Sequence, residues 1–207
     1  MDRWTADDIP DQSGRTFIVT GANSGLGYVT TRELARRGAH VILAVRDEAR
    51  GAQAVEKLRA EQPEARLEVR RLDLSDLDSV SAFAKGVIAD GTRVDVLVNN
   101  AGIMMPPRSL TAQGFELQFG VNHLGHFALT GLLLDTLTAS GNGRVVTVSS
   151  ALVTSQVVFD LELADRGHPG TALGKLDESV EQADAVFGGG GQVAADRAEL
   201  AGAGERA

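Results

Sequence analysis

The sequence contains no cysteine and only one tyrosine, Tyr28, among its 207 residues. The absence of cysteine excludes disulfide frameworks, cysteine-ligated zinc, iron–sulfur clusters and thiol nucleophiles. No uninterrupted apolar run approaches the roughly 18 residues that a membrane-spanning helix needs. Acidic residues occupy the amino terminus, where a secretory signal would carry a basic start and an apolar run. We therefore expect a cytoplasmic protein without a membrane span.

Basic residues are outnumbered by acidic ones. Lys and Arg number 20 against 28 Asp and Glu, which gives a formal net charge of −8 at pH 7. A protein this acidic is a poor nonspecific ligand for nucleic acid or for an anionic membrane, so we expect neither as a partner. The remaining composition, 43% hydrophobic and 23% charged, is that of a globular protein with the length of about one domain.

Five short apolar runs lack polar alternation, as expected of strands buried on both faces of a sheet. They cover residues 16–20, 40–45, 67–72, 94–98 and 144–148. Helical patterns lie between them at residues 26–35, 48–61 and 119–138, and Ser75 to Asp78 has the spacing of a capping box at the start of another helix. Alternating strands and helices predict a Rossmann-like α/β fold, with a parallel sheet and helices on both faces.

A glycine-rich turn follows the first strand and precedes the first helix. Its glycines, Gly21, Gly25 and Gly27, have a G-x-x-x-G-x-G spacing. Glycine lets the backbone turn tightly and approach a ligand, and the N–H groups at the start of a helix attract phosphate. No Gly-Lys-Ser/Thr follows the turn, which excludes a P-loop. The placement of the turn predicts a dinucleotide site.

The end of the second strand is where such a site meets the ribose. An acid there would accept hydrogen bonds from the 2′-hydroxyl, but Val45 occupies the place and Arg46 follows. A guanidinium without the acid suits a 2′-phosphate, which predicts a preference for NADP(H) over NAD(H). Two alternatives stay open: Arg46 is simply solvated, or it pairs with Asp47.

Motifs from about residue 13 to residue 150 resemble the short-chain dehydrogenase/reductase family. Residues 20–27 are similar to its TGxxxGxG cofactor turn, and residues 99–102 to its NNAG motif. Within the family, Asn-Ser-Gly-Leu-Gly at residues 23–27 and Asn-His-Leu-Gly-His-Phe at residues 122–127 are most similar to the branch of retinol dehydrogenases and protochlorophyllide reductases. The resemblance implies Ser150 and Asn122 as catalytic residues. It implies cofactor contacts at Gly21, Asn23, Ser24, Gly25, Leu26, Gly27, Arg46, Asp73, Leu74, Asn99, Ala101 and Gly102.

The sequence departs from the family at the proton donor, which is the tyrosine of a Tyr-x-x-x-Lys motif. No tyrosine follows Tyr28, and only Thr171 and Lys175 keep the spacing. An aliphatic hydroxyl is a poor acid or base near neutral pH. The resemblance implies an NADP(H)-dependent oxidoreductase for a small carbonyl or alcohol substrate, impaired by the missing tyrosine. The alternative is a non-catalytic nucleotide-binding module or a truncated gene product.

The resemblance and the composition together divide the chain into four parts. Residues 1–12 are an amino-terminal extension, 13–160 the dinucleotide-binding domain and 161–187 a remnant of the catalytic region. From Gly188 to Ala207, six glycines and six alanines leave only two larger apolar side chains, so we expect a disordered tail. The sheet is therefore expected to be incomplete at its carboxyl-terminal side, and a homo-oligomer is left open.

A pair of histidines and a pair of methionines can each be explained without a metal or substrate site. His123 and His126 lie three residues apart, but no third ligand has suitable spacing, so packing or solvent exposure is favoured and no metal site is predicted. Met104 and Met105 either line a substrate entrance or fill gaps in the core.

Overall fold

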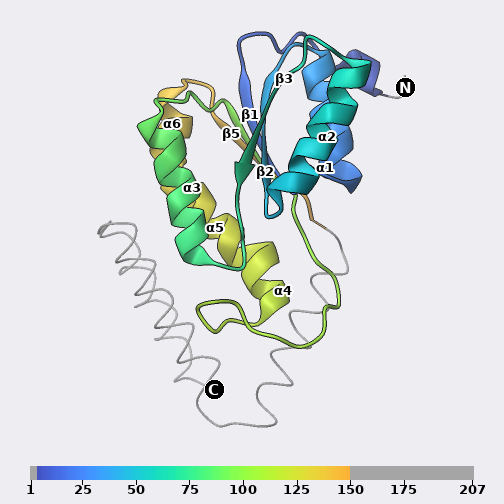
Figure 1. Ribbon diagram of the computed structural model, residues 1–207. Coiled ribbons are helices and arrows are strands. Elements are labelled where there is room, and N and C mark those ends of the chain that lie inside the picture. The colour runs from blue at the N-terminus through green and yellow to red at the C-terminus, as the bar shows by residue number, and fades with distance from the viewer. Residues whose placement is uncertain (1–3, 150–207) are drawn as a thin grey trace, which may run out of the picture. The chain divides into compact units, whose positions relative to one another are not determined.

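A five-stranded parallel sheet organises residues 4–149, the part of the chain that the computed structural model describes (Figure 1). The strands lie in the order β3-β2-β1-β4-β5, so the order reverses between β1 and β4. Their bounds are β1 Thr16–Thr20, β2 His40–Val45, β3 Arg66–Arg71, β4 Val96–Asn99 and β5 Arg144–Thr147. The predicted Rossmann-like fold is confirmed.

Helices cover both faces of the sheet, α1 and α2 on one face and α3, α5 and α6 on the other (Figure 1). Their bounds are α1 Gly25–Arg36, α2 Glu48–Glu61, α3 Leu77–Ala89, α5 Gly125–Leu132 and α6 Leu134–Ala139. Three short pieces complete the described helices: η1 Ala6–Asp8, α4 Leu117–Phe119 and the π-helical turn η2 Gly120–Leu124. In this part of the chain, no helix is both long enough and apolar enough to cross a bilayer.

The core lies on both faces of the sheet because successive strand residues point in opposite directions. Phe17 and Val19 of β1 pack on the α1 and α2 side, and Ile18 between them packs on the α3 and α5 side. The same alternation holds in β2 and β4. A strand buried on both faces needs apolar residues at every position. This explains why the sequence predicts β1, β2 and β4.

The stretch 119–138 is not the single helix that its periodicity predicts. The structure divides it into the π-helical turn η2 and the separate helices α5 and α6, with Leu133 (φ −97°, ψ 2°) between them. Leu129, Leu133 and Leu137 are all buried, so the apolar repeat continues across the break. Periodicity alone therefore could not detect it.

The predicted capping box at Ser75 is also wrong. Helix α3 begins one residue later, because the Asp76 carboxylate accepts the N–H of Asp78 at 3.0 Å. The Ser75 hydroxyl is already engaged, since it donates to Oδ1 of Asp73 at 2.6 Å.

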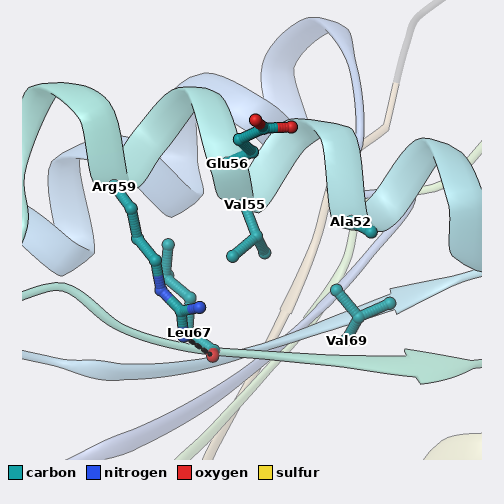
Figure 2. Close-up of a pocket in the computed structure, with 6 residues that line it drawn as sticks. All are labelled: Ala52, Val55, Glu56, Arg59, Leu67 and Val69. Atoms are coloured by element: carbon teal, nitrogen blue, oxygen red, sulfur yellow. Dashed lines mark hydrogen bonds between the residues drawn. The ribbon is translucent and has the colours of Figure 1, made fainter.

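A groove of about 420 Å³ lies between α2 and the edge strand β3 (Figure 2). Its walls are Ala52, Val55, Glu56, Arg59, Leu67 and Val69. Arg59 reaches across from α2, and its Nη2 donates to the Leu67 carbonyl oxygen at 3.0 Å. Exposed sheet edges template pairing with other chains, and this contact occupies one carbonyl of β3.

Candidate functional site

A second cleft, of about 460 Å³, opens where the strand order reverses between β1 and β4. In open α/β sheets, ligands bind at the carboxyl ends of the strands at this point. The lining comes from the turn after β1, the ends of β2 and β3, the segment after β4, and the α4–η2 region. The lining residues are Gly21, Asn23, Ser24, Gly25, Leu26, Ala44, Arg46, Leu72, Asp73, Leu74, Asn100, Ala101, Gly102, Ile103, Leu117, Val121 and Val148.

The turn after β1 requires its glycines for two reasons. Gly21 (φ +65°) and Gly25 (φ +56°) adopt the left-handed conformation that L side chains rarely take. At Gly27, a Cβ atom would lie 2.5 Å from Nδ2 of Asn100 and 2.6 Å from the carbonyl oxygen of Gly21. The start of α1 therefore packs directly on the turn and on the segment that follows β4.

The start of α1 is suited to an anion. Ser24 stands at its N-cap position, and its side chain makes no capping hydrogen bond. The first N–H groups of the helix are thus not capped by that side chain, and they carry the partial positive charge of a helix start. Leu26 is 69% exposed and lines the cleft rather than joining the core.

Thr20, at the end of β1, fastens the segment after β4 to the floor of the cleft. Its hydroxyl oxygen accepts the N–H groups of Asn100 and Ala101, each at 2.9 Å. The Asn100 side chain adds a third hydrogen bond to Thr20, because its Nδ2 donates to the Thr20 carbonyl oxygen at 2.8 Å. These bonds fix the backbone that carries Ala101 and Gly102 into the cleft wall.

Asn122 lies in the π-helical turn, and its side chain is paired with a backbone segment. Its Oδ1 accepts the N–H of Ile103 and its Nδ2 donates to the Ile103 carbonyl oxygen, both at 2.8 Å. The pair holds η2 beside the segment that follows β4. Val121, one residue earlier, lines the cleft, whereas Asn122 does not.

Arg46 is exposed at the end of β2 and faces the cleft. The neighbouring Asp47 caps α2 instead: it accepts the N–H of Arg50 at 3.1 Å and lies 3.6 Å from the Arg50 Nε. Within residues 4–149, no carboxylate forms an ion pair with Arg46. The alternative in which Asp47 pairs with Arg46 is therefore wrong in this structure.

Asp73 follows β3 and also lines the cleft. Its Oδ1 accepts from the N–H of Ser75 at 3.0 Å and from the Ser75 hydroxyl at 2.6 Å. The backbone N–H of Asp73 donates to the Ser79 hydroxyl oxygen at 3.0 Å, so the residue is held in a fixed turn.

Ten of the twelve residues expected to contact a cofactor line the cleft; Gly27 and Asn99 do not. Gly27 packs beneath the turn, and Asn99 Nδ2 donates to the Thr130 hydroxyl at 3.0 Å, which ties β4 to α5. Ser150, Thr171, Lys175 and the tail 188–207 lie outside the described residues. Sequence reasoning missed the apolar part of the wall, residues Ala44, Leu72, Ile103, Leu117, Val121 and Val148.

The two histidines have different surroundings. His123 is exposed and stacks between Phe119 and Phe127, with ring centroids 5.3 and 6.4 Å away. His126 is 5% exposed and contacts Thr20 and Asn122. Burial lowers the pKa of His126 below its ordinary value, while the hydrogen bond to Asn122 opposes that shift. Among residues 4–149, no three His, Asp or Glu side chains are grouped to hold a metal ion.

Met104 and Met105 follow the NNAG segment on the surface. They are 62% and 70% exposed, so the alternative that they fill gaps in the core is wrong.

Comparison with known proteins agrees with this geometry. The family model for short chain dehydrogenases matches residues 15–159. Retinol dehydrogenase 12 of Mus musculus is 51% identical over 137 residues, which are 66% of this chain and 43% of the relative. The chain thus spans less than half the length of that relative.

Solved structures show the same fold. An uncharacterized protein from Mycobacterium paratuberculosis is 54% identical, with a TM-score of 0.62 over 72% of this chain and 50% of that one. The RhlG/NADP complex of Pseudomonas aeruginosa is 28% identical, with a TM-score of 0.58 over 68% of this chain and 56% of that one. With the family model covering well over half of its residues, the chain belongs to the short chain dehydrogenase family.

Proposed function

We propose that the cleft binds NADP(H) in preference to NAD(H), and that the chain belongs to an oxidoreductase for a small carbonyl or alcohol. The observation that carries the cofactor preference is Arg46, which faces the cleft and forms no ion pair with any carboxylate of residues 4–149. A guanidinium binds a phosphate through two parallel hydrogen bonds. The NADP complex of RhlG, a relative of the same fold, supports a nicotinamide cofactor in this family.

The residues present fit such a cofactor. Gly21 and Gly25 bring backbone close to the ligand, and the start of α1 offers N–H groups to a pyrophosphate. Asp73 and Leu74 would border the adenine, with Arg46 at the ribose. Ala101 and Gly102 would continue the wall toward the nicotinamide, which supplies or accepts the hydride when bound.

The catalytic roles follow from the family resemblance. Ser150 would hydrogen-bond the substrate oxygen. Asn122 would act through backbone geometry, since both ends of its amide are taken up by Ile103. Asn99 and Gly27 would support the site from beneath, through Thr130 and Asn100.

Residues 4–149 place no tyrosine in the lining of the cleft, and the sequence has no tyrosine after Tyr28. Its one tyrosine, Tyr28, packs against the core on the α1 and α2 side of the sheet. Hydride transfer to a ketone without a proton leaves an alkoxide, which is unfavourable near neutral pH. This observation favours a second candidate function, a nucleotide-binding module without turnover.

Isothermal titration calorimetry with NADPH and NADH tests the cofactor preference. Arg46→Ala should weaken NADPH binding by about 1.5–3 kcal/mol and change NADH binding little, because the charge-assisted contact to the 2′-phosphate is lost. Arg66→Ala is the matched control. Arg66 is the first residue of β3, at the end of the strand away from the cleft, so this substitution should change neither affinity. Equal affinities of the parent protein for the two cofactors would contradict the proposal.

A further inference from the structure

The hydroxyl of Thr20 has four polar neighbours but can donate only one hydrogen bond. The N–H groups of Asn100 and Ala101 point at it, each at 2.9 Å, and both must donate. These two bonds occupy the two lone pairs of the hydroxyl oxygen. The Thr20 proton is therefore left for an acceptor, either Nε2 of His126 at 2.9 Å or the Val98 carbonyl oxygen at 3.4 Å.

The shorter distance assigns the proton to His126, and this assignment fixes the state of the imidazole ring. If Nε2 accepts from Thr20, it carries no hydrogen. The ring is then neutral with its hydrogen on Nδ1, and Nδ1 lies 3.1 Å from the carbonyl oxygen of Asn122, which can only accept. Both ring nitrogens are satisfied in this tautomer and in no other. A ring that is 5% exposed has little access to water as a substitute partner.

We propose that His126 is a positioning residue of the cofactor site: it takes the Thr20 proton and so keeps both Thr20 lone pairs aimed at the backbone of Asn100 and Ala101. That backbone carries Ala101 and Gly102 in the cleft wall. The other side of the ring holds the carbonyl of Asn122 in the π-helical turn. One side chain on α5 thus links the end of β1, the segment after β4 and η2. The inference rests on the proposed function, because the cleft must hold a nicotinamide nucleotide for this link to matter.

Two variants of His126 test the roles of the two ring nitrogens separately. His126→Gln keeps an acceptor within reach of Thr20 but loses the donor to Asn122, and His126→Asn keeps a donor near Asn122 but loses the acceptor. We expect His126→Gln to bind NADPH as the parent protein does. We expect His126→Asn to bind about fivefold more weakly, which corresponds to one hydrogen bond of roughly 1 kcal/mol.

Substitutions at Thr20 test whether the two residues act as one unit. Thr20→Ser keeps the hydroxyl and should bind NADPH normally. Thr20→Val should bind more weakly, and adding His126→Asn to it should have no further effect, since the link is already broken. Additive losses would overturn the proposal.

Nitrogen-15 NMR of the imidazole in the parent protein tests the assignment without any variant. The proposal requires a protonated Nδ1 and an unprotonated Nε2 for His126 at neutral pH, and a protonated Nε2 would overturn it. Equal NADPH affinity of the parent and His126→Asn would overturn it as well while leaving the proposed function intact. Failure of the parent to bind NADPH at all would overturn the proposed function and this inference together.

Discussion

Gly27 and Gly86 both lie in helices, and replacing each with alanine should have opposite effects on stability. Alanine is favoured over glycine inside a helix by about 1 kcal/mol, so the substitution stabilises wherever there is space. A Cβ atom on Gly86 in α3 would meet no atom within 4 Å. Gly86→Ala should therefore raise the free energy of unfolding by about 0.5–1 kcal/mol.

At Gly27, the added methyl group would collide with its surroundings. Its neighbours at 2.6 and 3.1 Å are backbone atoms of Gly21 and Ala22, and the Gly21 N–H is fixed to the Ala44 carbonyl oxygen at 2.9 Å. Overpacking of this kind costs about 1–3 kcal/mol, which exceeds the helix gain. Subtracting the helix gain, we expect Gly27→Ala to lose up to about 2 kcal/mol net.

Urea unfolding followed by circular dichroism measures both changes, and NADPH titration measures whether the turn still binds. Gly27→Ala should also weaken NADPH binding, because α1 can no longer approach the turn. If Gly27→Ala were as stable as Gly86→Ala and bound NADPH normally, the close approach would not be needed and the reasoning about the turn would be refuted.

Three more outcomes follow from named contacts. Arg59→Ala should increase aggregation in light scattering by freeing the Leu67 carbonyl on β3, whereas Lys57→Ala on the same helix should not. Because burial holds the pKa of His126 below its ordinary 6.5, the unfolded chain binds that proton first. Stability from this group is complete above pH 6.5 and is lost as the pH falls below it, at up to ~1.4 kcal/mol per pH unit. Burial lowers the pKa of His40 as well, so urea titrations should find a steeper slope in the parent than in His126→Gln. Without a tyrosine donor, NADPH oxidation with aldehydes and ketones should run ~10²–10⁴-fold slower than in a complete relative, and turnover near 1 s⁻¹ that Ser150→Ala abolishes would argue against this impairment.

The fold was predictable chiefly because β1, β2 and β4 are buried on both faces of the sheet. The expected burial on both faces is wrong for β5, whose residues are exposed among the described residues. All five strands begin and end within two residues of their predicted bounds, and β1 and β2 match them fully. Continuous apolar β-branched runs carry that signal at every position. The helix breaks were not predictable, because the π-helical turn depends on the amide of Asn122 pairing with Ile103, a contact between segments that periodicity does not encode.

The parts of the candidate site that local sequence motifs define were predictable. The parts in which contacts between distant segments determine how side chains pair were not. The glycine turn and the residues after β4 could be placed from their neighbours in sequence. Whether Asp47 pairs with Arg46 depends on capping by the first turn of α2, and this competition is visible only in the structure. The role of His126 depends on Thr20, which is 106 positions away along the chain.

In the proposed function, the cleft where the strand order reverses between β1 and β4 holds the nicotinamide cofactor. Hydrogen–deuterium exchange with and without NADPH tests it most directly, because it reports the location as well as the fact of binding. We predict slower exchange in residues 21–27 and 99–103, and unchanged exchange in residues 52–59 and 67–69 around the groove between α2 and β3. Protection confined to that groove, or no protection in residues 21–27, would contradict the account.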